Sequence, residues 1–134
     1  MKKHYVVSAA VITHGPKILC VQRNKSKYDY ISYKYEFPGG KLEEGESGEE
    51  AIVREIKEEL NLDISVSAQY LTVEHEYPDF SLTMHSFLCT TDNPHPELRE
   101  HVDAKWLEWT ELEQLDWAAA DIPIVEKLIS TNAL

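Results

Sequence analysis

The segment EFPGGKLEEGESGEEAIVREIKEEL, residues 36–60, carries the clearest structural signals in the chain. Ser47 followed by Glu50 has the form of a capping box, in which each side chain satisfies a free backbone N–H at a helix start. Apolar residues then recur at helical spacing and predict a buried face. They are Ile52, Val53, Ile56 and Leu60. Asn61 tolerates the left-handed conformation that closes many helices, so a helix is predicted from about residue 47 to residue 60.

A cluster of glutamates lies on a different face of this predicted helix. Glu55, Glu58 and Glu59 stand at positions i, i+3 and i+4, which share one face. Like charges at this spacing destabilise an isolated helix. A bound Mg²⁺ or Mn²⁺ would reverse that effect, because hard divalent ions prefer carboxylate oxygens. The alternative is a solvated acidic helix face, which is the commoner role of such a pattern.

The residues around the cluster favour the metal site over the solvated face. Gly39 and Gly40 permit close backbone approach and expose a carbonyl that could join the metal. Arg54 can pair with Glu58 on the helix or reach back to Glu46, and either contact would hold carboxylates in place.

This pattern resembles the signature of the Nudix hydrolases, G-x5-E-x7-R-E-U-x-E-E-x-G-U, where U is a bulky aliphatic residue. The matching residues are Gly40, Glu46, Arg54, Glu55, Ile56, Glu58, Glu59 and Leu62. Asn61 replaces the last glycine, and because asparagine adopts positive φ more readily than most residues, we expect the turn to be preserved. The segments EFPGGK and AADIPIVEKL, together with Arg23, extend the resemblance to the MutT-like branch over nearly the whole chain.

The resemblance implies an α/β fold, the Nudix α/β/α sandwich with a mixed central sheet, as a single domain over residues 1–134. It implies Mg²⁺-dependent cleavage, with Mn²⁺ as a substitute, of a nucleoside diphosphate linked to another group. The MutT-like branch includes bacterial CTP and oxidised-nucleotide pyrophosphohydrolases. For that branch, the resemblance implies conversion of a nucleoside triphosphate to the monophosphate and pyrophosphate.

The same resemblance suggests the residues that hold the metal. Glu55 and Glu59 correspond to ligands, Glu58 shares that duty, and Gly39 is the candidate for a metal-binding carbonyl. With the loop residue Glu100 added, the metal set is Gly39, Glu55, Glu58, Glu59 and Glu100.

Catalytic roles are less specific. Glu100 occupies the loop position of an additional glutamate in MutT-like proteins, but it could be a plain loop residue, and Glu97 competes with it. The group that takes the proton from the attacking water stays open between Glu55 and a glutamate outside the motif. The catalytic set is Glu55, Glu58, Arg54 and Glu100.

Three residues are candidates for substrate binding. The guanidinium fork of Arg23 suits phosphate oxygens, with a surface arginine as the alternative. Lys41 is either a second phosphate contact or a solvated neighbour of nearby glutamates. Asp121 either caps the last helix or reads the base edge. An ionised aspartate only accepts hydrogen bonds, so it would select a base that presents N–H donors, such as cytosine or guanine.

Aromatic residues crowd the loop before the motif. They are Tyr28, Tyr30, Tyr33 and Tyr35. One could stack on a base, and the others are expected to pack on the sheet edge or lie exposed. Phe37 and Trp106 are predicted core residues.

The rest of the chain reads mostly as strands, with a final helix. The predicted strands are residues 5–12, 17–22, 35–37, 63–75, 80–90 and 101–109, and the helix begins near Asp121 with Pro123 in its first turn. A slip of the apolar alternation at Tyr70 and Leu71 indicates a bulge. Consecutive strands in the middle suggest hairpins, so we expect a mixed sheet covered by helices on both faces.

Composition limits the possible partners. The chain has 134 residues and a formal net charge of −11, which disfavours binding to a nucleic acid polymer. No apolar run approaches the roughly 20 residues of a membrane-spanning helix. Cys20 and Cys89 are expected to be buried thiols in a cytoplasmic protein, although a disulfide between them stays open. The first residues resemble a signal peptide for a few positions, but a buried strand fits better. A monomer or a homodimer is expected.

Two other functions remain open at this stage. One keeps the chemistry and changes the substrate, for instance to ADP-ribose. The other is a non-catalytic nucleotide-binding module, which the complete set of acidic positions argues against.

Overall fold

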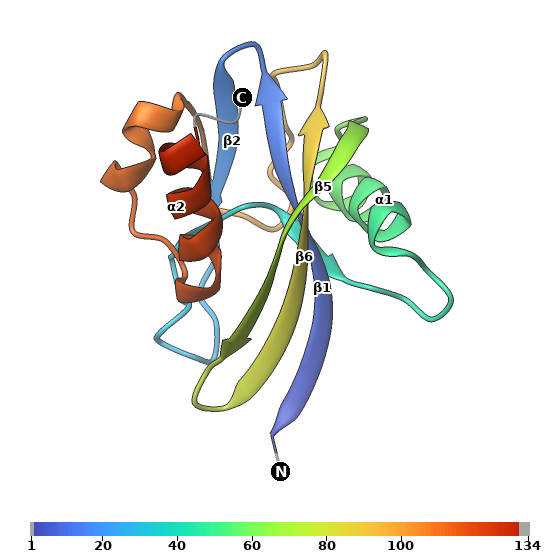
Figure 1. Cartoon of the computed structure of the whole chain (residues 1–134). Helices are drawn as coiled ribbons and strands as arrows, with labels where there is room; N and C mark the ends of the chain where they lie inside the picture. Colours follow the sequence, from blue (N-terminus) through green and yellow to red (C-terminus); the bar gives the residue numbers. More distant parts are fainter. Residues whose placement is uncertain (1, 132–134) are drawn as a thin grey trace.

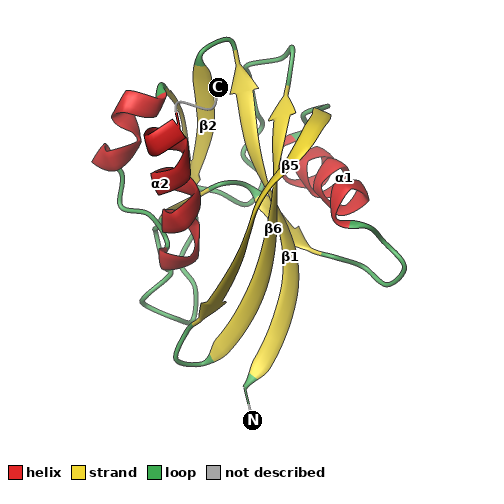
Figure 2. Cartoon of the chain, viewed as in Figure 1, coloured by secondary structure: helices red, strands yellow, loops and turns green. Residues whose placement is uncertain are grey.

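The computed structural model describes residues 2–131, in which one sheet of seven strands forms the centre of the fold. The strands are β1 (Lys3–His14), β2 (Lys17–Gln22), β3 (Tyr35–Glu36), β4 (Gly39–Lys41), β5 (Ser65–Glu76), β6 (Phe80–Thr90) and β7 (Asp103–Leu107). The helices of this part of the chain are α1 (Gly48–Leu60), α2 (Ile122–Thr131) and the 3₁₀ helices η1 (Trp109–Gln114) and η2 (Ala119–Asp121). Figure 2 shows the strands twisting together between the helices.

Strand β1 organises the sheet. It pairs in parallel with β6 along nearly its whole length, and it pairs antiparallel with β2 and β4. Beyond β6 lies β5, which pairs antiparallel with β6, and beyond β2 lie β3 and β7. The predicted mixed sheet is therefore confirmed, as is the α/β fold class.

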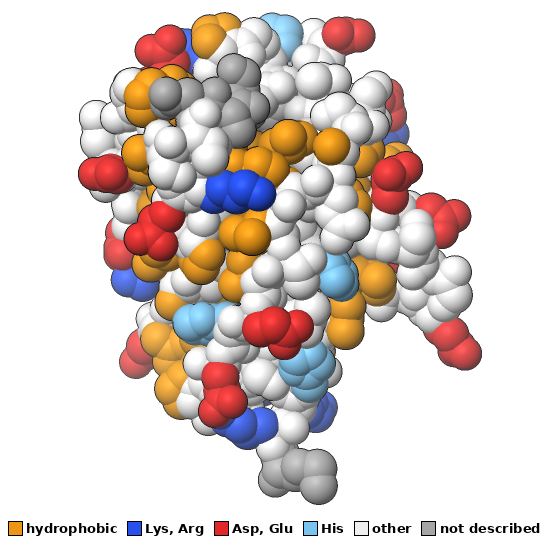
Figure 3. Space-filling model, in the orientation of Figure 1, with side chains coloured by type: hydrophobic (Ala, Val, Ile, Leu, Met, Phe, Trp, Pro, Cys, Tyr) orange, Lys and Arg blue, Asp and Glu red, His pale blue; other side chains and the backbone are white. Residues whose placement is uncertain are grey.

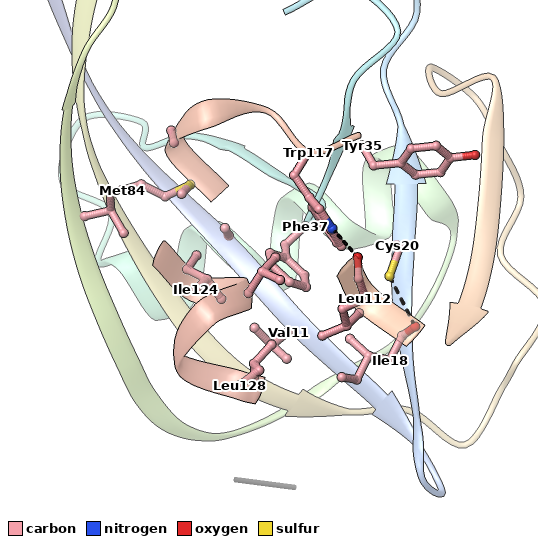
Figure 4. Close-up of a cluster of buried hydrophobic side chains, with 14 of the residues drawn as sticks. Val11, Ile18, Cys20, Tyr35, Phe37, Met84, Leu112, Trp117, Ile124 and Leu128 are labelled. Carbon is pink, nitrogen blue, oxygen red and sulfur yellow. Dashed lines mark hydrogen bonds between the residues drawn. The ribbon is translucent and has the colours of Figure 1, made fainter. Parts of the chain in front are cut away.

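The two α-helices cover opposite faces of the sheet (Figure 1). Neighbouring residues of a strand point to opposite faces, so β1 contributes Ala10 and Ile12 to the core under α1 and Ala9 and Val11 to the core under α2. Figure 4 shows the second core, where α2 directs its apolar side chains toward the sheet. Helices on both faces, as expected from the sequence, are confirmed.

Helix α1 begins and ends as its sequence predicts. The hydroxyl of Ser47 accepts a hydrogen bond from the Glu50 N–H at 3.1 Å, and the Glu50 carboxylate accepts one from the Ser47 N–H at 2.9 Å. Asn61 closes the helix at φ 51°. The prediction for Val53 is wrong, because its side chain is 41% exposed. The buried stripe follows the i, i+4 line from Ile52, and Val53 lies on the flank of that line.

The other elements agree with the sequence except in detail. Register shifts of β5 against β6, one of them between Gln69 and Thr72, confirm the bulge. Strand β1 is longer than predicted, and β7 is shorter. Strand β4 was not predicted, because Pro38-Gly39-Gly40 has the composition of a turn. Phe37 is buried as predicted, whereas Trp106 is only partly buried.

Both cysteines are free and buried, on opposite faces of the sheet. Burial raises the pKa of the Cys20 and Cys89 thiols to about 12. The disulfide alternative is therefore wrong.

The surface carries many acidic side chains. On the face in Figure 3 they are spread over the molecule instead of forming one patch, in keeping with the formal net charge of −11. Among residues 2–131, none of the helices combines the length and the apolar character that crossing a membrane requires.

Candidate active site

Strand β4 brings the glycines of the motif against both β1 and α1. Gly39 pairs with Ala9 and Gly40 pairs with Ser8. A Cβ atom on Gly39 would lie 1.9 Å from the Ser8 carbonyl oxygen, and one on Gly40 would lie 2.5 Å from the Glu55 carboxyl carbon. Only glycine therefore lets the carboxylate of α1 lie directly against this strand.

Two glutamates of α1 face the glycines from the helix. Glu59 is buried, with 6% of its surface exposed, and the Glu55 carboxyl group lies beside it. Burial raises the pKa of Glu59 well above its ordinary value. The nearby carboxyl group of Glu55 and the charges of Glu100 and Glu36 raise this pKa further. Carboxylates gathered this closely repel one another unless a proton or a cation is shared between them.

These glutamates line a hollow of about 410 Å³. Its walls combine acidic side chains, basic side chains and glycine backbone. They comprise Arg23, Asn24, Lys25, Glu36, Gly39, Gly40, Lys41, Glu55, Glu59, Glu100 and His101. The hollow therefore combines carboxylate oxygens with cationic side chains, which suits a metal ion and a phosphate group together.

Arg54 holds the outer acids of the motif in place. Its Nε donates to Glu46 Oε2 at 2.7 Å, and its Nη2 donates to Glu46 Oε1 at 2.9 Å. Its Nη1 donates to Glu55 at 2.9 Å and to Glu58 at 3.1 Å. The hydrogen bonds from Arg54 lower the pKa of Glu46 to about 2. Arg54, which does not itself line the hollow, thus fixes one oxygen of Glu55.

A second cavity, of about 320 Å³, lies beside the hollow. Its walls are mainly aromatic and apolar and include Tyr5, Tyr28, Phe37, Tyr77, Phe80 and Met84. Asp121 also lines it, buried at 4% exposure, and its Oδ1 accepts a hydrogen bond from the Phe37 N–H at 3.0 Å. Burial raises the pKa of Asp121 well above its ordinary value.

The two spaces meet at a shared wall. Five residues line both of them: Arg23, Glu36, Gly39, Gly40 and Lys41. A flat apolar group and an anionic chain joined to it would therefore find adjoining sites of suitable chemistry.

Comparison with known proteins identifies the family. The model of the NUDIX domain matches residues 2–128. The chain belongs to the Nudix family. The 8-oxo-dGTP diphosphatase of Escherichia coli is 29% identical over 96% of this chain and 98% of that relative. The CTP pyrophosphohydrolase of the same organism is 32% identical over 95% of this chain and 93% of that relative. A solution structure of a MutT protein from methicillin-resistant Staphylococcus aureus is 40% identical, with a TM-score of 0.74, and covers 97% of this chain and 98% of its own.

Most of the candidate residues of this Nudix domain come together. Gly39, Glu55, Glu59 and Glu100 surround the hollow, Arg23 and Lys41 stand at the shared wall, and Asp121 lines the apolar cavity. Glu58 does not line the hollow; its carboxylate is exposed and pairs with Arg54. The Lys41 ammonium lies 4.2 Å from the ring centre of Tyr5.

Asp121 directly precedes α2, but its carboxylate contacts the backbone of Phe37 on the neighbouring segment. Its position at the helix start is therefore as predicted. The capping hydrogen bond is not observed, because within residues 2–131 the Asp121 carboxylate accepts from Phe37 on another segment and not from an N–H of α2. The tyrosines divide as expected: Tyr28 and Tyr30 stack at 5.4 Å between ring centres, and Tyr33 is exposed.

Sequence reasoning missed two residues of the Nudix site. Glu36 accepts hydrogen bonds from Arg23 and His101, each at 3.0 Å, and His101 Nε2 lies 3.9 Å from the Glu59 carboxylate. A charged residue between the buried Tyr35 and Phe37 was the available signal for Glu36. His101 follows Glu100 directly, but a single histidine gives no spacing from which to predict a role.

The residues of the hollow fit a hard divalent cation by their chemistry. The carboxylates of Glu55, Glu59 and Glu100, with the glycine backbone of β4, offer only oxygen ligands, and the missing Cβ of Gly40 leaves room beside Glu55. Within residues 2–131, no three His, Cys, Asp or Glu side chains already stand as one compact ligand set.

Proposed function

We propose that this Nudix hydrolase cleaves a nucleoside triphosphate to the monophosphate and pyrophosphate, with Mg²⁺ as the cofactor and Mn²⁺ as a substitute. One observation carries the proposal: an aromatic cavity joins an acidic hollow through a wall that holds Arg23 and Lys41. A base would occupy the first space, and a phosphate chain would extend into the second.

The divalent ion would be held by Glu55 and Glu59 with the Gly39 carbonyl, and by Glu100 from the opposite loop. When bound, such an ion neutralises charge on the phosphate chain and lowers the pKa of a coordinated water. Glu58 would assist from outside the hollow, where its carboxylate accepts a hydrogen bond from Arg54.

The remaining roles belong to the protein's own side chains. Arg23 and Lys41 would bind phosphate oxygens, because both line the wall between the two spaces. Either Glu55 or Glu100 would accept the proton of the attacking water, and Arg54 would fix the orientation of Glu55 through its 2.9 Å hydrogen bond.

The aromatic lining of the cavity supports binding of a nucleobase, and its buried acidic side chain supports selection among bases. Asp121 is the buried acidic side chain that lines this cavity, so we propose that it contacts the base edge. The relatives include a CTP pyrophosphohydrolase and an 8-oxo-dGTP diphosphatase, so CTP, a modified dCTP and 8-oxo-dGTP are the substrates to test first.

The test is a substrate panel with Mg²⁺. The panel contains CTP, dCTP, 5-methyl-dCTP, 8-oxo-dGTP and ADP-ribose, and products are separated by anion-exchange chromatography. Pyrophosphate released from a triphosphate supports the proposal. Formation of AMP and ribose phosphate from ADP-ribose would show that ADP-ribose, and not a triphosphate, represents the substrate class. Nucleotide binding without turnover would indicate a binding module.

The setting of this activity is also part of the proposal. We place the enzyme in the cytoplasm, because two buried free thiols suit a reducing compartment and nucleoside triphosphates are available there. It would act as a monomer or a homodimer, which sedimentation in the presence of nucleotide would determine.

A further inference from the structure

Glu36 occupies a central position that the proposed function does not yet use. Its side chain lines both the aromatic cavity and the acidic hollow, and only 15% of it is exposed. One carboxylate oxygen accepts from Arg23 Nη1 at 3.0 Å, and the other accepts from His101 Nε2 at 3.0 Å. Both oxygens are therefore committed to side chains of the site.

Arg23 depends on this contact for its orientation. Within residues 2–131, the hydrogen bond to Glu36 is the only one made by the Arg23 side chain, and its buried Nε has no partner. The side chain is 40% exposed, so packing covers its Nε but leaves the rest of the side chain partly open to solvent. Without an acceptor at Glu36, the long side chain of Arg23 would sample other rotamers.

Glu36 is in turn fixed by its surroundings. His101 is 5% exposed in its side chain, so it forms a rigid support for the second oxygen. The backbone segments that carry these residues are joined independently of the side chains: the Arg23 N–H donates to Lys34 O at 2.9 Å, and the Val102 N–H donates to Gln22 O at 3.0 Å. The backbone can therefore keep its course when the Glu36 side chain is replaced.

We propose that Glu36 is a positioning residue that holds the Arg23 guanidinium at the wall between the two cavities, with His101 holding Glu36 from the other side. This inference rests on the proposed function for the role of Arg23 at the phosphate chain. Glu36 acts through Arg23, so its loss weakens substrate binding and leaves the acids of α1 in place.

The first experiment measures the mobility of Arg23 without any substrate. The chain has three arginines, Arg23, Arg54 and Arg99, so their Nε–H groups give three side-chain NMR signals, and Arg23→Lys identifies the relevant one. In the native protein the ¹⁵Nε order parameter of Arg23 should be about 0.8. In Glu36→Leu this order parameter should fall below about 0.6, while the order parameter of Arg54 stays unchanged.

Three further variants make this experiment decisive. Glu36→Ala replaces Glu36→Leu if the latter does not fold, and Glu36→Gln, which retains one acceptor oxygen, should give an intermediate value. Glu76→Leu removes a surface acid paired with Lys2 and should leave the Arg23 signal unchanged. An order parameter of Arg23 that is equal with and without the Glu36 carboxylate would overturn the proposal.

The second experiment is a double-mutant cycle with Arg23→Ala. Glu36→Leu should raise KM for the triphosphate about tenfold, with kcat changed by less than about threefold. In the Arg23→Ala background the same change should alter KM by less than about twofold, because the group through which Glu36 acts is already absent. An undiminished effect in that background would show that Glu36 acts elsewhere, for instance as a metal ligand. If the native protein hydrolyses no nucleotide, the proposed function fails, and the NMR experiment still decides the role of Glu36.

Discussion

Arg54 and Glu46 meet through two parallel hydrogen bonds, of 2.7 Å from Nε and 2.9 Å from Nη2. This bidentate geometry joins the end of the loop that precedes α1 to the middle of the helix. Arg54 also donates to Glu55. The same arginine that ties the loop to the helix therefore holds an acid of the site.

The Arg54–Glu46 pair predicts a specific loss of stability in acid. The folded pKa of Glu46 is lowered from 4.5 to about 2, so this group stabilises the fold above pH 4.5 and loses that contribution as the pH falls toward 2. In Glu46→Gln, the free energy of unfolding should vary less with pH inside that window. Urea midpoints of both proteins, measured inside and above the window, test this. Parallel curves would contradict it.

The two glycines of β4 predict two different defects. Gly40→Ala should fold but lose about a hundredfold in turnover. Its Cβ would lie 2.5 Å from the Glu55 carboxyl carbon and would push this carboxylate out of place. Gly39→Ala should instead destabilise the fold by about 1–3 kcal/mol, because its Cβ would meet the backbone of Ser8 at 1.9 Å. Steady-state kinetics and thermal unfolding of both variants separate these effects. Equal loss of stability in both would refute the distinction.

Glu59 predicts a conflict between stability and activity. Its folded pKa is raised above the ordinary 4.5, so in a chelating buffer the fold loses stability as the pH rises above that value. Glu59→Gln removes this penalty, and it should be more stable than the native protein at alkaline pH with chelator. Its turnover with Mg²⁺ should fall at least about a hundredfold. Calorimetric melting curves in chelator, with Glu49→Gln as a control on the exposed start of α1, measure the first effect.

Asp121 predicts a separation between base selection and folding. Asp121→Asn keeps an oxygen that can accept from the Phe37 N–H but replaces the titratable oxygen with an NH₂ group that always donates, so the ranking of triphosphates by kcat/KM should change. Asp121→Ala leaves the buried Phe37 N–H unpaired and should cost about 1–3 kcal/mol of stability. An unchanged substrate ranking in Asp121→Asn would remove Asp121 from base recognition.

The cysteines predict slow reaction with thiol reagents. Both thiols are buried, and burial raises the pKa of each to about 12, so almost no thiolate is available near neutral pH. In the folded protein neither cysteine should react within the time in which both react in denaturant. Colorimetric titration of the thiols follows this directly, and rapid labelling of Cys20 or Cys89 under native conditions would be inconsistent with the observed packing.

Local patterns predicted the parts of the fold that local interactions determine. Helix α1 starts with the hydrogen bonds of Ser47 and Glu50 and ends at Asn61, all within short distances along the chain. The family motif similarly predicted two of the acids that line the hollow, Glu55 and Glu59, because its spacing on a helix already places them on one face. The failure at Val53 concerned the width of the buried stripe, which the neighbouring sheet decides.

The residues that were missed depend on contacts between distant segments. Glu36 meets His101 across 65 positions of sequence, and no spacing rule connects them. Strand β4 was missed for the same reason, since two glycines have little strand propensity and pair only because β1 lies beside them.

The order of residues alone therefore determined the helix with its acidic face, the alternating strands and the family, because these follow from periodicity and from a long, specific motif. Tertiary structure decided which acids face the hollow, where Asp121 directs its carboxylate, and how Arg23, Glu36 and His101 meet. Those choices follow from packing two helices against a twisted sheet, which brings side chains together by position in space instead of by their separation along the chain.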